Sequence, residues 1–481
     1  MTTFARRSKD GAHAPTLSEE LSAQQTASPG QLAVALAIAA VIGVGALVAP
    51  LSTAIALIAL VTLAYLAALI YRLAAFWLSL RHPEVVDVSE EEARAIPDEL
   101  LPVYTILVPA YREPSVIAGL VARLSELDYP KDKLDIRLLL EQDDGETIAA
   151  AKAAHPGRQF TIVRVPHSEP KTKPKACNYG LEGARGQFIT IYDAEDWPEP
   201  LQLRRAVAAF ARLGPSVACL QAKLSYYNAD QNLLTSWFTI EYAMWFSFLL
   251  PGLVAQRGPL PLGGTSNHFR AEILLGVGGW DPYNVTEDAD LGIRLARRGY
   301  QTRVLESTTC EEANSDVINW IKQRSRWYKG YMQTWLVHTR HPLALRRDLG
   351  WRGFIAFNLF VAGTPLLSLI NPVFWAMTAL WFVVHPAVLL TLFPAWLYYL
   401  GLAVMLVGNF SLFYAWLVSA RISSSSRLVF AALLIPLYWV LMSLAAVKAA
   451  VQLISAPSFW EKTVHGLDTA PSPASRDVPI N

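Results

Sequence analysis

The sequence has almost no charge imbalance and few cysteines. Its 481 residues carry 41 Lys and Arg against 40 Asp and Glu, a formal net charge of +1. Broad nucleic-acid binding needs a basic surface, so this balance argues against nucleic acid as a partner. The 3 cysteines, Cys177, Cys219 and Cys310, have no paired or metal-type spacing. They are typical of reduced thiols in a cytosolic domain.

Other signatures are also missing. No serine or cysteine nucleophile stands beside a base motif, and the chain has no internal repeat. His268, His338 and His465 have no spacing that indicates a metal site. The first apolar stretch starts too late and runs too long for a cleaved signal peptide. Residues 1–30 are polar and without periodicity, which predicts a disordered N-terminal tail.

Apolar residues are abundant. The chain is 53% hydrophobic with 15 Trp, yet 17% of its residues are charged. This is too apolar for an ordinary soluble enzyme and too charged for a pure membrane bundle. A soluble domain joined to membrane helices accounts for both observations.

Two apolar segments near the start predict a membrane hairpin over residues 31–80, because each reaches the roughly 20 residues that cross a bilayer core. Flanking basic residues place both ends of this hairpin in the cytosol: Arg6, Arg7, Lys9 and Arg81. The acidic residues 81–101 are predicted to be a linker.

The chain turns apolar again over residues 348–457, which contain three or four predicted spans. Lysine and glutamine in residues 442–455 predict that part of this segment lies flat at the interface. Arg421 and Arg427 favour a cytosolic loop, yet a single span after them places the C-terminus outside, so charge leaves the topology open. Residues 458–481 are predicted to be a C-terminal tail.

Between the apolar ends, residues 102–347 alternate between strand and helix patterns. Buried strands are predicted at 103–109, 134–140, 160–165 and 188–192, and amphipathic helices at 114–127, 146–154 and 174–185. Such alternation gives a mostly parallel sheet with helices on both faces. Ligands in these sheets bind at the carboxyl ends of the strands.

An acidic turn follows one of these ends. Asp193, Glu195 and Asp196 come directly after the strand at 188–192. Their carboxylates are hard oxygen ligands suited to Mg²⁺ or Mn²⁺ on the diphosphate of a nucleotide. A solvated turn without metal is the alternative.

Two further groups end a strand or begin a helix. Asp143 and Asp144 follow another strand and could contact a nucleotide, or simply form an Asp-Asp-Gly turn, with Glu141 leaving the register of this contact open. Lys173 and Lys175 lie at a helix start, where a lysine favours a phosphate or a uracil carbonyl. A solvated basic loop is the alternative.

A second acidic motif lies later in the chain. Thr286, Glu287 and Asp288 open a predicted helix, where Thr286 is a natural cap and the acids suit the helix dipole. The functional alternative is that Asp288 takes the proton of an acceptor hydroxyl.

A helix predicted over residues 315–339 carries Gln323, Arg324, Arg326 and Trp327. A Trp here fits a membrane interface without any site role. The functional alternative is that Arg326 clamps a diphosphate and Trp327 stacks on a sugar.

The order of these motifs resembles that of family 2 inverting glycosyltransferases, whose α/β domain has a Rossmann-like GT-A fold, here between transmembrane helices. The likeness spans about residues 103–335 and is nearest to membrane-embedded polysaccharide synthases such as cellulose and hyaluronan synthases. The family signature is a separated Asp, an Asp-x-Asp, a Thr-Glu-Asp and a Gln-x-x-Arg-Trp. Here these fall at 143–144, 193–195, 286–288 and 323–327.

The resemblance implies a role for each residue. Asp288 is the base, and Glu287 beside it contacts substrate. Glu113 and Asp143, with Asp144 adjacent, face the uridine. The other implied contacts are Lys175 near the uracil or phosphate, Asp193 with Glu195 or Asp196 on Mg²⁺ or Mn²⁺, Gln323 and Arg326 on the diphosphate, and Trp327 at the acceptor. The motif Asp-Ala-Glu-Asp departs from Asp-x-Asp, which leaves the second metal ligand open.

The leading hypothesis is a processive synthase that extends a β-linked polysaccharide from a UDP-sugar, coupled to its export. The alternative is a single addition to a lipid-linked or short glycan, and a non-catalytic nucleotide-binding transporter is a third. The resemblance implies a bacterial inner-membrane protein with a cytosolic catalytic domain. Its partners are a nucleotide sugar, a glycan or lipid-linked acceptor, membrane lipid, and export or regulatory subunits. Residues 459–465 are either a gating segment over the donor or an interfacial anchor.

Overall fold

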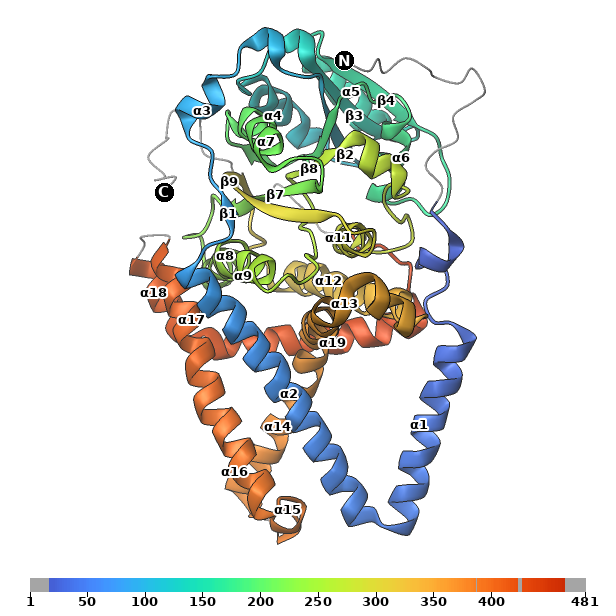
Figure 1. Cartoon of the computed structure of the whole chain (residues 1–481), viewed down its shortest axis with the longest axis vertical. Coiled ribbons are helices and arrows are strands. Elements are labelled where there is room, and N and C mark those ends of the chain that lie inside the picture. The colour runs from blue at the N-terminus through green and yellow to red at the C-terminus, as the bar shows by residue number, and fades with distance from the viewer. Residues whose placement is uncertain (1–16, 386, 423–425, 463–481) are drawn as a thin grey trace.

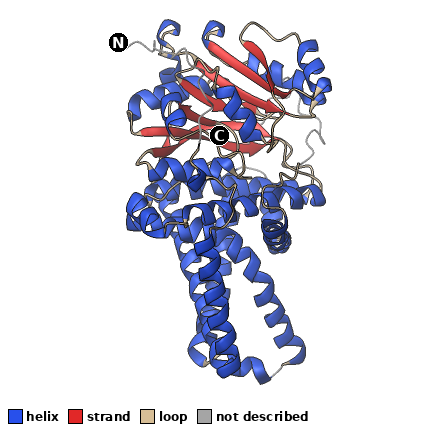
Figure 2. Ribbon diagram, turned by 90° about the vertical axis from the view of Figure 1, so that its right-hand side faces the viewer, coloured by secondary structure: helices blue, strands red, loops and turns tan. Residues whose placement is uncertain are grey.

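The computed structural model describes residues 17–385, 387–422 and 426–462. A sheet domain forms one end of the molecule, a layer of crossing helices lies below it, and long helices extend from that layer (Figures 1 and 2). The sheet domain lies between the two groups of long helices in the chain, as the sequence predicts.

The described residues contain a nine-stranded mixed sheet with the order β1-β9-β7-β8-β5-β2-β3-β4, and β6 pairs with β9. Its strands are β1 (Val85–Val86), β2 (Tyr104–Ala110), β3 (Leu134–Glu141), β4 (Phe160–Val165), β5 (Phe188–Ile191), β6 (Trp197–Pro198), β7 (Val217–Tyr226), β8 (Asn267–Arg270) and β9 (Gln301–Glu311). Strands β5, β2, β3 and β4 are parallel, whereas β8 runs antiparallel between β5 and β7. The α/β fold class is confirmed.

Helices cover both faces of the sheet. One face packs against α3 (Glu90–Arg94), α4 (Pro114–Ser125), α5 (Gly145–Ala153) and α7 (Gln202–Leu213), and the other against α6 (Lys173–Leu181), α10 (Ala271–Gly276) and α11 (Glu287–Arg297). Ile106, Val108 and Leu138 are buried toward the first group, while Leu107 and Leu139 are buried toward the second. This alternation follows from the two-residue period of a strand and explains why the strands are apolar throughout.

The predicted linker 81–101 contributes to the sheet. Its strand β1 pairs in parallel with β9, joining Val85 to Val304 and Val86 to Leu305. The segment also contains α3 and the 3-10 turn η2 (Asp98–Leu100). The linker prediction is therefore wrong for these residues, because acidic composition hid a two-residue strand too short to show a period.

Helices of the layer below the sheet run across the long helices. They are α8 (Leu233–Met244), the π-helical turn η4 (Trp245–Leu249), α9 (Leu250–Ala255), α12 (Val317–His338), α13 (Pro342–Phe357), α18 (Ser426–Leu433) and α19 (Ile435–Ser455). Figure 1 shows α19 nearly perpendicular to α2 and α17. The interfacial helix near residues 442–455 stays a prediction.

The long helices are α1 (Pro29–Val48), α2 (Pro50–Arg81), α14 (Gly363–Val384), α16 (Ala395–Ala403) and α17 (Asn409–Ile422), with the short α15 (Ala387–Leu392) at the far end. The π-helical turns η5 (Asn358–Ala362) and η6 (Val404–Gly408) join α13 to α14 and α16 to α17. Among the described residues, 6 helical runs are long and apolar enough to cross a membrane. One is Leu233–Ala255, which is 61% buried within the protein and belongs to the layer of crossing helices.

The N-terminal segment is ordered where the structure describes it. Residues 17–28 include the 3-10 turn η1 (Glu19–Leu21) and lie against the sheet domain. The Ser22 hydroxyl donates to Asp281 Oδ1 at 3.0 Å, and the Arg340 guanidinium donates to backbone carbonyls, including Ser22 O at 3.0 Å. The predicted disordered tail is therefore wrong for residues 17–28, and residues 1–16 lie outside the described part. A polar sequence without periodicity can still be held by hydrogen bonds to its backbone.

Candidate active site

One cavity of about 1590 Å³ begins at the carboxyl ends of β2, β3 and β5 and continues between the long helices. Its wall brings together residues of the acidic turn, the 286–288 motif and the 323–327 motif, together with Glu113: Asp193, Glu195, Glu287, Asp288, Gln323, Arg326 and Trp327. The 193–196 turn and residue 288 thus share one cleft.

The three carboxylates of the acidic turn after β5 lie in two different environments. Asp193 and Glu195 line the cavity. Asp196 is fully buried, and its Oδ2 accepts from the Asp193 N–H at 2.8 Å and from the Thr265 hydroxyl. Burial, with Asp193 and Glu195 nearby, raises the pKa of Asp196 well above its usual range. Asp196 therefore supports the turn from within, rather than facing the cavity as the sequence-based prediction has it.

A fourth carboxylate joins this group. Glu311, at the end of β9, lines the cavity, and its Oε1 is buried without a hydrogen bond. Burial, then Asp196 and Glu195, raise the pKa of Glu311. The described residues contain no set of three or more metal-type ligands already close enough to hold an ion. The concentration of carboxylates and the orphaned oxygen nevertheless fit a hard cation.

Lys173 connects the acidic turn to the catalytic helix. It forms an ion pair with Asp193 and donates to Gly264 O at 2.8 Å. Burial opposes its charge, but Asp193 and Glu287 raise the pKa of Lys173 above its usual value. A Cβ added to Gly264 would lie 3.6 Å from Asp288 Oδ2 and 3.9 Å from Lys173 Nζ. The glycine therefore leaves open space between the candidate base and the lysine.

Glu287 and Asp288 form the first turn of α11. Burial raises the pKa of Asp288 to about 6, against the opposing effect of Lys173 and Arg326. Burial and the Asp288 charge raise the pKa of Glu287. A carboxylate with a pKa near the working pH is suited to accept a proton. Thr286, predicted as the cap, makes no capping hydrogen bond with its side chain.

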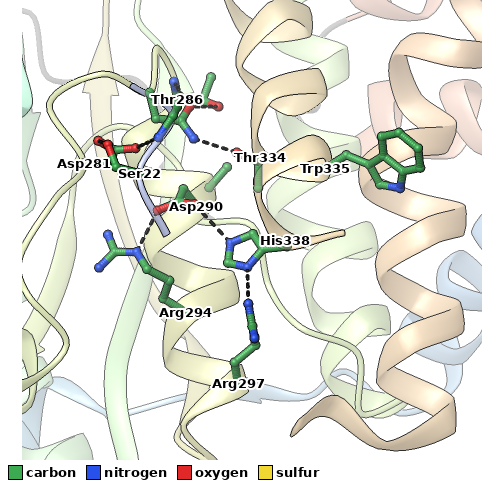
Figure 3. A network of polar contacts seen from close by, with 12 residues as sticks. Ser22, Asp281, Thr286, Asp290, Arg294, Arg297, Thr334, Trp335 and His338 are labelled. Atoms are coloured by element: carbon green, nitrogen blue, oxygen red, sulfur yellow. Dashed lines mark hydrogen bonds and ion pairs between the residues drawn. The ribbon is translucent and has the colours of Figure 1, made fainter. Parts of the chain in front are cut away.

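A polar network behind α11 fixes this turn (Figure 3). Asp290 accepts from Arg294 Nε at 2.7 Å and lies 3.0 Å from His338 Nε2, while Arg297 lies 3.1 Å from His338 Nδ1. Burial works against the Asp290 charge, but Arg294 and His338 hold the pKa of Asp290 below its usual value. His338 thus has the structural role that its spacing predicts, because it ties α12 to α11.

The nucleotide end of the cavity differs from the prediction. Asp143 is half-exposed and pairs with Lys171 at 2.7 Å outside the cavity lining. Asp144 is buried and caps α5 by accepting from the Thr147 N–H at 3.2 Å. The carboxylate that lines the cavity from β3 is Glu141.

On helix α6, too, the lysine that lines the cavity is not the one that was predicted. Lys175 pairs with Glu141 at 2.8 Å, yet Lys173 is the lysine that lines the cavity. The two lysines are two residues apart, which is about 200° around a helix axis, so they lie on different sides of α6. The side on which each lysine lies depends on the helix start, which the sequence locates only to within a residue or two.

Helix α12 supplies the wall opposite the acidic turn. Arg326 faces the cavity, its Nε is buried without a partner, and its guanidinium lies 4.5 Å from the Trp460 ring. The Trp327 ring lies 4.6 Å from the Arg324 guanidinium, which forms an ion pair with Glu241. Arg324 is thus held in an ion pair with Glu241, whereas the Arg326 guanidinium still has an N–H group that can donate to a ligand.

Residues 456–462, after α19, pack against α12 and against the residues that follow β2. Lys329, fully buried, donates to Phe459 O at 2.7 Å and to Ala456 O at 3.2 Å. Lys462 donates to Tyr111 O and lies 3.6 Å from Glu113. Residues 456–462 therefore lie over the end of the cavity that follows β2, whereas His465 is outside the described residues. Lys171, Lys329 and Glu311 escaped the sequence-based prediction, since no motif marks them.

Comparison with known proteins identifies relatives of this chain. Residues 102–330 match the family model described as glycosyltransferase-like family 2. The chain is 27% identical over 263 residues to the probable glycosyltransferase YdaM of Bacillus subtilis (strain 168), covering 54% of this chain and 61% of that protein. It is 27% identical over 276 residues to a β-monoglucosyldiacylglycerol synthase of Synechocystis sp., covering 54% and 56%. The chain spans less than two thirds of the length of these curated relatives.

A solved structure shares the fold. The mannosyltransferase PcManGT from Pyrobaculum calidifontis, in complex with GDP-Man and Mn²⁺, superposes with a TM-score of 0.53 over 82% of this chain and 99% of that one, at 18% identity. The family match, the sheet order and this superposition lead to one assignment. Residues 102–330 form a glycosyltransferase domain of family 2 with the GT-A fold.

Proposed function

We propose that the protein is a membrane-embedded inverting glycosyltransferase that transfers one sugar from a nucleotide-sugar donor to a lipid acceptor. The observation that carries this proposal is the single cavity, which runs from Asp288 and the 193–196 turn to an apolar wall between the long helices. Both substrates can meet in such a space, one from the aqueous side and one from the membrane.

The donor would occupy the sheet end of the cavity. Glu113 and Glu141 line the place for the nucleoside, and Arg326 has donors free for the diphosphate. Asp193 and Glu195 would hold Mg²⁺ or Mn²⁺, with Glu311 below them and Asp196 supporting the turn. When bound, such an ion neutralises the charge of the leaving diphosphate.

Asp288 would act as the general base. It would take the proton of the acceptor hydroxyl while that oxygen attacks the anomeric carbon and the nucleoside diphosphate leaves. Burial raises the pKa of Asp288, Lys173 and Arg326 oppose this rise, and Gly264 leaves room for the sugar. A single displacement of this kind inverts the anomeric configuration.

The lipid acceptor is favoured by the wall of the membrane half. Its lining is dominated by side chains such as Phe374, Trp375, Trp381, Leu390 and Met405. Apolar walls of this kind match an acyl or isoprenoid chain. A polar glycan passing through would leave its hydroxyls without partners over much of this surface, which costs free energy.

A processive synthase remains the second candidate, and two observations favour it. Trp327 lines the cavity, where it can stack on an acceptor sugar, and residues 456–462 lie over the donor end. The apolar lining decides against it in this proposal.

The experiment is a product analysis. Purified protein in lipid nanodiscs, supplied with Mg²⁺ or Mn²⁺ and a panel of labelled UDP- and GDP-sugars, should place label in the organic phase as single-sugar lipids. Label that appears only as an aqueous polymer would favour the processive synthase instead. An Asp288→Asn preparation serves as the blank.

We further propose that the protein resides in a bacterial inner membrane with its sheet domain in the cytosol. The support is the supply of nucleotide sugars there, together with the basic residues that flank the first hairpin. Export or regulatory subunits belong to the processive alternative.

A further inference from the structure

Arg72 is a charged side chain within the apolar helix α2, and it lines the cavity. One guanidinium nitrogen donates to the Thr364 hydroxyl at 2.6 Å, whereas its Nε is buried without a partner. Its guanidinium lies 5.4 Å from the Phe360 ring. A charge in such a place is costly and usually marks a functional contact.

The carboxylate that acts on Arg72 electrostatically, Glu241, is already engaged. Glu241 accepts from Arg324 at 2.8 Å through Oε1, and from the Tyr438 hydroxyl at 2.5 Å through Oε2. Arg324 and Glu241 therefore neutralise each other. Within the described residues, Arg72 has no carboxylate in ion-pair contact and remains the uncompensated cation of this part of the cavity.

Arg72 lies at the level of the crossing helices and not in the middle of the long bundle. The Gln256 amide donates to the backbone carbonyl of the preceding residue, Tyr71, at 3.4 Å, and Gly252 of α9 packs against Ala75 one turn further on. The 22 residues Pro50–Tyr71 of α2 span about 33 Å, close to the hydrocarbon thickness of a bilayer. The guanidinium is thus placed where lipid phosphates lie.

This position opens into the same cavity as Asp288. Tyr331 of α12 also lines that cavity and interacts electrostatically with both Asp288 and Arg72. An acceptor held at Arg72 by an anionic group therefore shares one cavity with Asp288.

We propose that Arg72 binds the phosphate of the acceptor, which is a lipid whose hydroxyl-bearing head group is joined to its apolar tail by a phosphodiester. This inference rests on the proposed function and specifies its substrate class. The head-group hydroxyl gives its proton to Asp288 and forms the new bond to the anomeric carbon, the nucleoside diphosphate leaves with the bonding electrons, and the phosphodiester is unchanged. A planar guanidinium suits this anion because it offers parallel N–H donors.

The test compares two acceptors with identical acyl chains, phosphatidylglycerol and diacylglycerol, in nanodiscs of uncharged lipid. The wild-type protein should glycosylate phosphatidylglycerol with the lower KM. Arg72→Gln should raise the KM for phosphatidylglycerol by about tenfold or more, as expected for loss of a charge-assisted hydrogen bond, with less effect on kcat. Arg72→Lys should recover part of this loss. Arg352→Gln, which alters an exposed arginine of α13, is the matched control and should match the wild type.

Binding gives a second readout that does not depend on turnover. Native mass spectrometry should show phosphatidylglycerol retained by wild type and lost from Arg72→Gln. Wild-type transfer to diacylglycerol but not to phosphatidylglycerol would overturn the phosphate contact and leave the lipid acceptor intact. Label that enters neither lipid but a polymer would overturn the proposed function itself. The acceptor that the wild-type protein prefers decides between these results on its own. The test therefore holds even if the Arg72 variants do not fold.

Discussion

In the proposed mechanism, Asp288 is the residue on which the chemistry depends most. It lines the cavity at the start of α11, with Gly264 leaving space in front of it and Lys173 beside it. The Asp290–Arg294–His338 network behind it leaves the turn little freedom to move. A carboxylate held in this way can take a proton without first reorganising.

Replacing Asp288 with Asn should remove this function while keeping the shape of the turn. We expect transfer to fall by about 10²- to 10⁴-fold, the usual contribution of a general base. Nucleotide affinity, measured by calorimetry, should stay within about twofold, because the donor is held by other groups. Loss of nucleotide binding in parallel with activity would instead indicate a structural role for Asp288.

The pH profile offers an independent check on the same residue. Burial raises the pKa of Asp288 to about 6, so the group is protonated below that pH and cannot accept a proton. We expect kcat/KM to fall by about tenfold for each pH unit below 6 and to level off above it. A profile that stays flat down to pH 5 would contradict this assignment.

The sequence predicts which groups of residues form the site, but not always which residue of each group lines the cavity. The sequence places Asp193, Asp288 and Arg326 correctly in one cleft, because motif order follows strand and helix ends. It selects Asp143 where the cavity is lined by Glu141, and Lys175 where it is lined by Lys173. These differences are one or two residues long and depend on the exact end of a strand or the start of a helix, which sequence patterns do not fix.

At the scale of elements, the packing of α12 against the Thr286 turn sets the geometry of the site. A Cβ on Gly330 would overlap the Thr286 hydroxyl. Gly330→Ala should therefore push α12 away from the turn, despite the higher helix propensity of alanine. We expect transfer to fall by about tenfold or more, since small displacements of catalytic groups are costly. A thermal melt separates this effect from unfolding, and Gly276→Ala, which meets open space, is the control.

The elements themselves divide into those with clear patterns and those without. Strands β2 to β5 and helices α4 to α6 lie close to their predicted ranges, although α6 ends at Leu181 and not at residue 185. Except for β3, each of them has a Pro or Gly at or near a border. Strands β7 and β9 were not predicted. Their hydrogen bonds join residues about 80 positions apart, as in the pair Leu220 and Arg303, and no local pattern reveals such pairing.

At the scale of the whole molecule, the chain leaves the sheet domain and comes back to it twice, first along α1 and α2 and then along α14, α16 and α17 (Figure 1). The α1–α2 turn and α15 both lie at the end farthest from the sheet (Figure 1). Because α19 lies across the bundle instead of passing through it, residues 456–462 return to the cavity. The topology that charge alone left open is thereby consistent with residues 456–462 on the side of the sheet domain.

Cysteine labelling can test this arrangement in a background that lacks the 3 native cysteines. Ser52→Cys, next to the α1–α2 turn, and His385→Cys, just before α15, should react with a membrane-impermeant maleimide in intact cells. Gln142→Cys, on the sheet domain, should react only after permeabilisation. Equal reaction of all three positions in intact cells would show that the long helices do not separate two compartments.

The central claim is that donor and lipid acceptor meet in one cavity beside Asp288. A cryo-electron microscopy structure of the Asp288→Asn protein with a non-hydrolysable nucleotide sugar, Mn²⁺ and a lipid acceptor tests it most directly. We predict the diphosphate between the 193–195 turn and Arg326, the acceptor hydroxyl beside residue 288, and the lipid tail along α14 and α16. A nucleotide bound elsewhere on the sheet, or a glycan chain threaded between the long helices, would contradict this account.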